Sequence, residues 1–548
     1  MAKYSVNTVQ TTNLDHHGLI AAICNDVDLV NRVNKRIESK DPRRIVSPGH
    51  SVKAMILNGL GFANRQLYLM PQFLENKPVD KLLGKGFVAT NFDDHTLGKA
   101  LDEIAAYGAT RFFAEIAFEI AIERGLIGKS VHVDTTTIST YGNQGSDKTD
   151  KIQLTPGYSK DKRFDLNQLI LSMVTSGKAE IPLWANVVSG NASDHNTLIN
   201  TIESVNVFRK QLQVGALEND LRFHWVCDAA GYSAPNLKAL ENCLWVMRVP
   251  ERIKEAAELV HMDDASFYWQ QLSDGYKISA HSSEYAEIKQ RWILVQSEQA
   301  YQREMITLQK NIAKAESTLT KKLKSLEKKV FKCAADAYKW GAEIQKEYPL
   351  FEISFTTNEL KKYSTAGRPP AGAELAISGY SLIAQHKKND VKIAETSRSK
   401  GKFIIATNDF DLASFSDVDV LSTYKEQQQA ERGFRFIKDP WFLLDSLFLK
   451  NVDRIIALMA VMTLCLLIYN LAQDTLRKAL IKTKNSIPNQ KGKLYQNPTM
   501  RWVMQLMEGI VVINNVTLTE IISNLNQVRI DIIEMFGPAA MKIYGIQT

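Results

Sequence analysis

The sequence has few cysteines, and none of them are spaced as zinc ligands. Five are present, an odd number without any CxxC pair: Cys24, Cys227, Cys243, Cys333 and Cys465. This argues against a disulfide framework and against a zinc site, and it fits a reducing cytoplasm. The first residues also lack the charged-then-apolar layout of a signal peptide, so we expect no export and a cytoplasmic location.

Long hydrophobic runs are almost absent as well. The one exception is 455–472, which is interrupted only by Thr463 and Asn470 and approaches the length of a membrane span. A helix buried on all sides of a large domain is the alternative explanation. We favour the buried helix and no membrane, because Asp453 and Arg454 adjoin the run and no comparable span exists elsewhere in the sequence.

Neither sign of charge dominates the chain. Its 548 residues carry a net charge of +7, and the pI is near 8.8. Such a length exceeds one hydrophobic core and predicts three or four soluble domains. A mildly basic balance is compatible with a nucleic-acid partner but does not demonstrate one.

Residues 1–125 are predicted to be helical, because apolar residues recur there at intervals of three and four. Basic residues surround the turn between the first two predicted helices and the segment after it: Arg32, Lys35, Arg36, Lys40, Arg43, Arg44 and Lys53. A surface for the DNA backbone and a solvated basic loop explain them equally well. A catalytic domain for DNA further along the chain would favour the first explanation.

From residue 130 the pattern changes to strands. We expect five strands, at 130–136, 169–174, 183–188, 221–228 and 244–249. A helix is expected over about 195–213, between the third and fourth strands. This order predicts an antiparallel meander joined to parallel strands. Asp134 and Asp228 each end a predicted strand, and their carboxylates meet at one sheet edge if those strands are parallel neighbours. Either residue alone is better explained as a turn or helix cap. His132 and His195 are not expected to be essential.

Residues 251–400 interrupt this unit. Apolar residues from Met305 to Val330 advance by threes and fours, which predicts one or two long helices packing as a coiled coil over about 286–345. We favour a structural or dimer-forming role for this rod over a DNA-binding role. It nevertheless has a basic flank: Lys321, Lys322, Lys324, Lys328 and Lys329.

A polar helix is expected over 424–438, with Ser422 as its cap candidate. Four of its side chains share one face: Tyr424, Gln427, Glu431 and Lys438. A carboxylate, an amide, a phenol and an ammonium on one stripe suit a site that holds a metal ion and phosphates together. A solvated surface helix is the alternative for this segment taken alone.

The spacing on this helix resembles that of bacterial insertion-sequence transposases of the DDE class, in the branch whose catalytic Glu lies in a Tyr, Arg, Glu, Lys signature. Tyr424, Glu431 and Lys438 keep its intervals, and Gln427 stands where the pattern has Arg. Residues 157–168 and 190–194 are similar to two further segments of that family. The order Asp134, Asp228, Glu431, with intervals of 94 and 203 residues, also fits it, with an insertion domain inside the second interval.

The resemblance implies an α/β fold. A ribonuclease-H-like catalytic core would be interrupted by an insertion domain with long coiled helices and flanked by helical N- and C-terminal regions. The implied division begins with a helical DNA-binding domain at 1–125 and the first catalytic part at 126–250. The insertion domain follows at 251–400, the second catalytic part at 401–475 and a helical C-terminal region at 476–548.

The resemblance also implies a transposase that binds the ends of an insertion sequence, cleaves phosphodiester bonds and joins the 3′-hydroxyl ends to target DNA. Asp134, Asp228 and Glu431 would hold Mg²⁺, or Mn²⁺ in its place, in a two-metal site. DNA would be contacted by Tyr424, Gln427, Lys438, Lys160 and Arg163.

Its implied partners are double-stranded DNA, as terminal inverted repeats and as target, and a second copy of the chain in a homodimeric synaptic complex. The expected location is the bacterial cytoplasm, on the nucleoid when DNA is bound. Two alternatives stay open: a non-mobile DNA nuclease of the same fold, and a catalytically impaired DNA-binding protein derived from a transposase.

Overall fold

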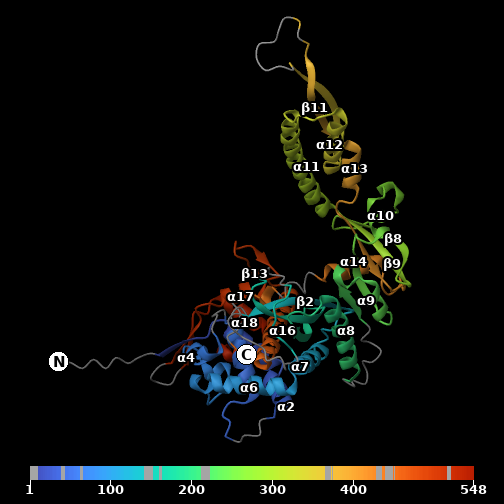
Figure 1. Cartoon of the computed structure of the whole chain (residues 1–548). Coiled ribbons are helices and arrows are strands. Elements are labelled where there is room, and N and C mark those ends of the chain that lie inside the picture. The colour runs from blue at the N-terminus through green and yellow to red at the C-terminus, as the bar shows by residue number, and fades with distance from the viewer. Residues whose placement is uncertain are drawn as a thin grey trace, which may run out of the picture. The chain divides into compact units, whose positions relative to one another are not determined.

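The computed structural model divides the chain into two compact units. The first comprises Met1–Val246 and Ser422–Thr548, and the second comprises Met247–Leu421. Figure 1 traces both along the chain, and each is described by itself. The structure describes all residues except 1–9, 39–42, 62–65, 141–151, 159–162, 212–222, 364–371, 373, 428–432, 434, 439–448, 450, 515–519 and 548.

The first unit begins with the predicted helices. They are α1 (His17–Asp26), α2 (Leu29–Arg36), α3 (Pro48–Gly59), α4 (Met70–Glu75), α5 (Val79–Leu82), α6 (Asp94–Tyr107) and α7 (Ala109–Glu123). Local signals fix two of their starts. Ser47 accepts from His50 N ahead of Pro48 in α3, and Asp93 accepts from Thr96 N at α6.

A mixed sheet follows, which belongs to the same unit as far as Val246 in its last strand. Its strands are β2 (Ser130–Thr140), β3 (Asn167–Ser176), β4 (Pro182–Ser189), β5 (His224–Cys227) and β6 (Trp245–Val249), in the order β4-β3-β2-β5-β6. β2 pairs with β3 and β3 with β4 in antiparallel fashion, whereas β2 and β5 are parallel. This confirms the predicted meander joined to a parallel strand. Helices α8 (Asp194–Gln211) and α9 (Ala234–Ala239) connect the later strands.

Helix α16 (Val452–Thr483) contains the apolar run and forms the core of the first unit. It passes the length and hydropathy test for a membrane span, but 89% of its most apolar window is buried inside the protein. Helices α1, α3, α6 and α7 and strand β4 all pack against it. The buried-helix interpretation is therefore the one that this structure supports.

The C-terminal region returns to the start of the chain. It contains α17 (Met500–Leu506), α18 (Gln527–Met535) and α19 (Pro538–Ile543), with short strands β13 (Ile487–Pro488), β14 (Leu494–Tyr495), β15 (Val511–Asn514) and β16 (Glu520–Ser523). Strand β1 (Gln10–Asn13) pairs with β15. The prediction of a helical C-terminal region was therefore only partly correct, because the region also contains strands. It completes the N-terminal part of the fold.

The second unit contains antiparallel strands in the order β12-β9-β8-β7, which follow β6 in the same nine-stranded sheet, and a separate hairpin. The sheet strands are β7 (Gln270–Gln271), β8 (Tyr276–Tyr285), β9 (Ile288–Ser297) and β12 (Lys402–Thr407), and the hairpin strands are β10 (Phe351–Lys362) and β11 (Ala376–Lys388). The helices are α10 (Lys254–His261), α11 (Glu298–Glu327), α12 (Ala334–Glu347) and α13 (Asp390–Arg398), and α14 (Asp417–Lys425) leads back to the first unit.

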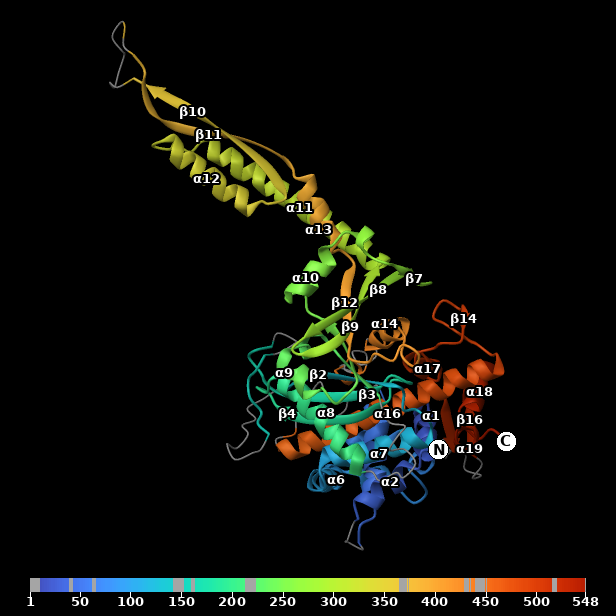
Figure 2. The ribbon, with the colours of Figure 1, turned by 90° about the vertical axis from the view of Figure 1, so that its right-hand side faces the viewer.

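The prediction of coiled helices over 286–345 was wrong in two respects. Residues 288–297 form β9, because the continuous apolar run from Trp292 to Val295 is the centre of a buried strand. The apolar face of α11 also packs on the β10–β11 hairpin rather than on another helix in a coiled coil. Figure 2 shows α11 and α12 lying along this hairpin.

Candidate active site

The pairing of β2 with β5 places Asp134 and Asp228 at the same level. Ser130 lies opposite His224 and His132 opposite Val226, an offset of 94 residues. Asp134 and Asp228 are separated by this same offset, two residues beyond the last pair. Neighbouring residues at one level of a parallel pair direct their side chains to the same face. The structure therefore brings the two predicted acids together.

Asp134 lies inside β2 rather than at its end, because the strand continues through the β-branched stretch to Thr140. This corrects the expectation that it closes a strand. Its Oδ1 accepts a hydrogen bond of 2.7 Å from the Thr135 backbone N. Asp228 follows β5 directly, and its Oδ1 accepts 2.9 Å from Ala230 N, which caps a 3₁₀ turn. The capping role and a ligand role are compatible, since the exposed Asp228 carboxylate has a second oxygen.

Buried Cys227 reports the combined charge of the two acids. Burial raises the pKa of its thiol, and the negative charges of Asp228 and Asp134 raise this pKa further. Both carboxylates therefore act on one point at the end of β5.

The segment after α14 crosses the face of β2 that carries Asp134. Ser130, His132 and Asp134 alternate along the strand and share this face. Ser130 Oγ donates to Glu426 Oε2 at 3.2 Å, and His132 Nε2 lies 3.6 Å from the same oxygen. Glu426 was not selected from the sequence, where a carboxylate in a polar segment is typical of solvated surface.

Further along this segment, Gly433 reaches the same face. A Cβ added there would lie 3.1 Å from Met173 Cε and 3.2 Å from Leu466 Cδ2. Met173 is the cross-strand partner of Asp134. Glu426 and Gly433 therefore flank the predicted third acid in the sequence and both contact this face. Glu431 itself lies outside the described residues, and the described ones contain no group of three His, Cys, Asp or Glu that would hold a metal.

The single helix predicted over 424–438 was partly wrong, because a turn at Glu426 divides the segment, whereas Gln427, Gly433 and 435–437 are helical among its described residues. Helix α14 already begins at Asp417, and Ser422 lies inside it rather than capping it. The start is fixed by a reciprocal pair, in which Asp419 N donates to Ser416 Oγ and Ser416 N donates to Asp419 Oδ2. The helix ends at Lys425 and Glu426 forms a turn, so Tyr424 and Lys438 do not belong to one uninterrupted helix.

The predicted DNA contacts have different surroundings. Tyr424 and Lys438 are half-buried, whereas Gln427 is buried, with 9% of its surface exposed. Arg163 is exposed and donates to both carboxylate oxygens of Asp165, at 2.9 and 2.8 Å. These hydrogen bonds lower the pKa of Asp165 to about 2. Lys160 lies outside the described residues.

The segments 157–168 and 190–194 meet through their glycines. Gln168 Nε2 donates to Gly190 O at 2.8 Å. A Cβ on Gly157 would lie 2.1 Å from Gly190 O, and one on Gly190 would lie 2.1 Å from Gln168 O. Backbone at this distance admits only glycine. These two stretches therefore hold the outer end of the meander together.

Three arginines of the predicted N-terminal DNA surface are paired inside the first unit. Arg32 bonds Glu119 and Glu123, Arg36 bonds Glu115 and Glu119, and Arg44 bonds Glu103. Their side chains are only 13, 8 and 8% exposed. These three residues therefore tie α2 and its loop to α6 and α7, and the structure does not support their assignment to DNA.

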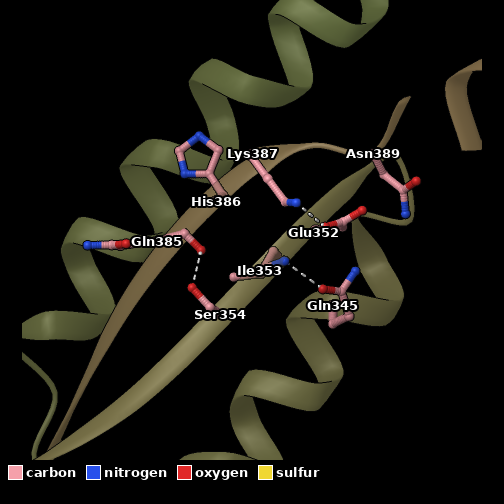
Figure 3. Close-up of a pocket in the computed structure, with 8 residues that line it drawn as sticks. All are labelled: Gln345, Glu352, Ile353, Ser354, Gln385, His386, Lys387 and Asn389. Atoms are coloured by element: carbon pink, nitrogen blue, oxygen red, sulfur yellow. Dashed lines mark hydrogen bonds and ion pairs between the residues drawn. The ribbon is translucent and has the colours of Figure 1, made fainter. Parts of the chain in front are cut away.

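A groove of about 550 Å³ lies between α12 and the β10–β11 hairpin of the second unit. Figure 3 shows that several of its polar side chains bond to neighbouring residues of the lining. Lys387 Nζ lies 2.8 Å from Glu352 Oε2, and Gln345 Oε1 accepts from Ile353 N at 2.9 Å. Its lining thus has no cluster of carboxylates, and the pair on β2 and β5 remains the candidate active site.

Comparison with known protein families gives two matches. Residues 130–471 match the family described as "Transposase DDE domain", and residues 9–118 match a domain of unknown function, DUF4277. The first match covers Asp134, Asp228, the second unit and the segment with Glu431. No curated protein matches the chain.

Proposed function

Because the chain belongs to the DDE transposase family, we propose that it is the transposase of an insertion sequence, which cleaves DNA at the element's ends and joins the 3′-hydroxyls to target DNA. The observation that carries this proposal is the shared level of Asp134 and Asp228 on parallel strands. The contacts of Glu426 and Gly433 with the same sheet face support Glu431 as the third acid.

The fold proposed for this activity is ribonuclease-H-like, with catalytic parts at 126–250 and 401–475 around the insertion at 251–400. Residues 1–125 would be the DNA-binding domain and 476–548 the C-terminal region. An antiparallel meander next to a parallel strand is compatible with this assignment. The proposed location is the bacterial cytoplasm.

The donor set at the site fits a divalent cation. Two carboxylates at one level are hard oxygen ligands, and Mg²⁺ prefers such ligands. Their charges already act together on Cys227. DDE transposases use divalent metals, and we propose Mg²⁺, or Mn²⁺, in a two-metal arrangement. When bound, the metal would activate the attacking hydroxyl and stabilise charge on the phosphoryl group.

The protein's own residues would hold and orient this site. Asp134 is fixed by β2 and Asp228 by its cap, so neither carboxylate has to be ordered when metal arrives. Glu426, bonded to Ser130 beside His132, would position the segment that carries Glu431. Tyr424, Lys438, Lys160 and Arg163 would contact the DNA backbone, whereas buried Gln427 could do so only after a local rearrangement. A homodimer would bring two element ends together.

Substitution of the three acids tests this proposal. Asp134→Asn, Asp228→Asn and Glu431→Gln should each reduce Mg²⁺-dependent cleavage of a duplex carrying an element end by about a hundredfold or more. Binding of that duplex should remain. The control is Glu241→Gln, which removes an exposed carboxylate from the same unit and should leave cleavage unchanged. Substantial cleavage by the Glu431 variant would overturn the triad.

A strand-transfer assay separates the proposal from a non-mobile nuclease. A duplex with a pre-cut 3′-hydroxyl end should be joined to a target plasmid by the wild-type chain with Mg²⁺. Cleavage without any joining would favour the nuclease. Binding of DNA with neither reaction would favour a catalytically impaired descendant.

A further inference from the structure

Helix α11 separates its charges by face. Its buried residues are Leu308, Ile312, Leu319, Leu323 and Leu326. At about 100° per residue, six exposed cations lie on the opposite face: Arg303, Lys310, Lys314, Lys321, Lys324 and Lys328. We call these six residues the basic stripe. The four acids of the helix, Glu298, Glu304, Glu316 and Glu327, lie on the half that faces the hairpin, within about 80° of the centre of the apolar face.

One cation of the basic stripe has an internal hydrogen bond, from Arg303 Nε to Gln299 O at 3.3 Å within its own helix. Among the described residues, none of the six forms an ion pair. This contrasts with Arg32, Arg36 and Arg44 of the first unit, which are paired with glutamates. Residues 298–400 contain 19 Lys and Arg and 12 Asp and Glu, a net charge of +7 that equals the net charge of the whole chain.

We propose that the basic stripe of α11 is a docking surface for the phosphate backbone of double-stranded DNA. This inference rests on the proposed function and adds a contact to it. From Arg303 to Lys328 the stripe is about 38 Å long at about 1.5 Å per residue, close to one turn of B-form DNA. Lysine is a flexible point charge that binds phosphate oxygens without reading sequence. The surface would therefore add affinity rather than base specificity.

An anionic membrane is the competing partner for a row of lysines. A helix that lies on a membrane inserts its apolar face. The apolar face of α11 is already covered by the hairpin, where Leu319 is fully buried and Leu323 is 4% exposed. Polar phosphates that approach from the solvent side fit the available face better than lipid does.

Helix α12 supplies a matched control surface. Its exposed face alternates in sign through Asp336, Lys339, Glu343 and Lys346. Lys339 and Lys346 are seven residues apart, as are Lys314 and Lys321 in the basic stripe. Two double variants, Lys314→Gln with Lys321→Gln and Lys339→Gln with Lys346→Gln, thus remove equal charge from exposed helix positions of one subdomain.

The test is binding of the full chain to a fluorescent 40-base-pair duplex of arbitrary sequence over a range of salt concentrations. The stripe variant should bind about tenfold or more weakly near physiological salt. Its slope of log affinity against log salt should fall by about 1.8, the value for two lost phosphate contacts. The α12 variant should behave as wild type, and circular dichroism should give equal melting curves for all three proteins.

Two outcomes would overturn the inference alone: equal DNA affinities for the two double variants, or a loss of binding to phosphatidylglycerol vesicles without a loss of binding to DNA. A wild-type chain without salt-dependent affinity for DNA would instead count against the proposed function itself. Weaker binding of element ends and of arbitrary duplex by the same factor would support the backbone contact.

Discussion

Gly190 shows how a single residue sets the end of the β2–β3–β4 meander. An added Cβ would lie 2.1 Å from Gln168 O and 2.5 Å from Thr155 O, both backbone atoms that cannot rotate away. We predict that Gly190→Ala destabilises the protein by about 3 kcal/mol, because only a backbone shift relieves the overlap.

Gly492→Ala is the control for Gly190→Ala. Gly492 has a φ of +74° with nothing within 4 Å of the added Cβ, so its cost is conformational only, about 1 kcal/mol. Chemical denaturation midpoints compare the two variants. Equal shifts would show that the close approach at Gly190 does not constrain the fold.

His16 gives the first unit a pH dependence. The ring is buried beside His17, with the centroids 4.4 Å apart, and its Nε2 donates to Leu60 O at 2.9 Å. Burial lowers the pKa of His16 to about 4 and that of His17 well below 6.5. The unfolded chain therefore takes up protons below about pH 6.5, whereas the folded chain does not.

We predict that stability is fully present above pH 6.5 and falls as the pH drops from 6.5 to 4. The loss due to His16 should reach about 3 kcal/mol at pH 4. Denaturation midpoints measured at several pH values should fall less steeply for His16→Gln, which keeps a donor for Leu60 O. His95→Gln, at an exposed position, should keep the wild-type pH dependence. If the stability of the His16→Gln variant depended on pH as steeply as that of the wild type, His16 would not be the source of the pH dependence.

At the scale of the elements, α16 contributes a long series of buried apolar side chains to the core. Leu464 is fully buried in it, whereas Ile481 of the same helix is 64% exposed. Leu464→Ala should cost about 2–5 kcal/mol because it leaves a cavity, and Ile481→Ala should change stability by no more than about 0.5 kcal/mol. Denaturation in the absence of detergent measures both. Similar small effects would contradict the assignment of α16 as a core helix.

Some elements could be predicted from the sequence and others could not. Strands β3, β4 and β6 begin and end within a few residues of the predicted runs, because alternation and β-branched residues mark them directly. The continuation of β2 beyond residue 136 was not predicted, because the repeated threonines after Asp134 show no apolar alternation. Intervals of three and four correctly predict that α11 has one buried face. They do not tell what covers it, and a hairpin rather than a second helix does.

At the scale of the whole molecule, the site is assembled from segments that are distant in sequence. The sequence supplied Asp134 and Asp228 as separate strand-associated acids, but their placement at one level of the sheet depends on a parallel register that only strand pairing reveals. The chain leaves the first unit at Val246 and re-enters it at Ser422. Glu426 and Gly433 then contact the sheet face of their own chain. The third acid is therefore expected to act within one chain, in cis, even in a dimer.

Mixing two inactive variants tests this assembly. Asp134→Asn and Glu431→Gln chains, combined in equal amounts and allowed to exchange subunits, should show no more Mg²⁺-dependent cleavage than either alone. Each chain of a mixed dimer keeps one damaged site, because its own segment after Ser422 contacts its own β2. A mixture of wild-type and Asp134→Asn chains is the control for subunit exchange. If subunits exchange, mixed dimers form and the cooperative cleavage of two ends by the wild type is lost. If the segments were exchanged between subunits, half of the mixed sites would contain all three acids and cleavage would return.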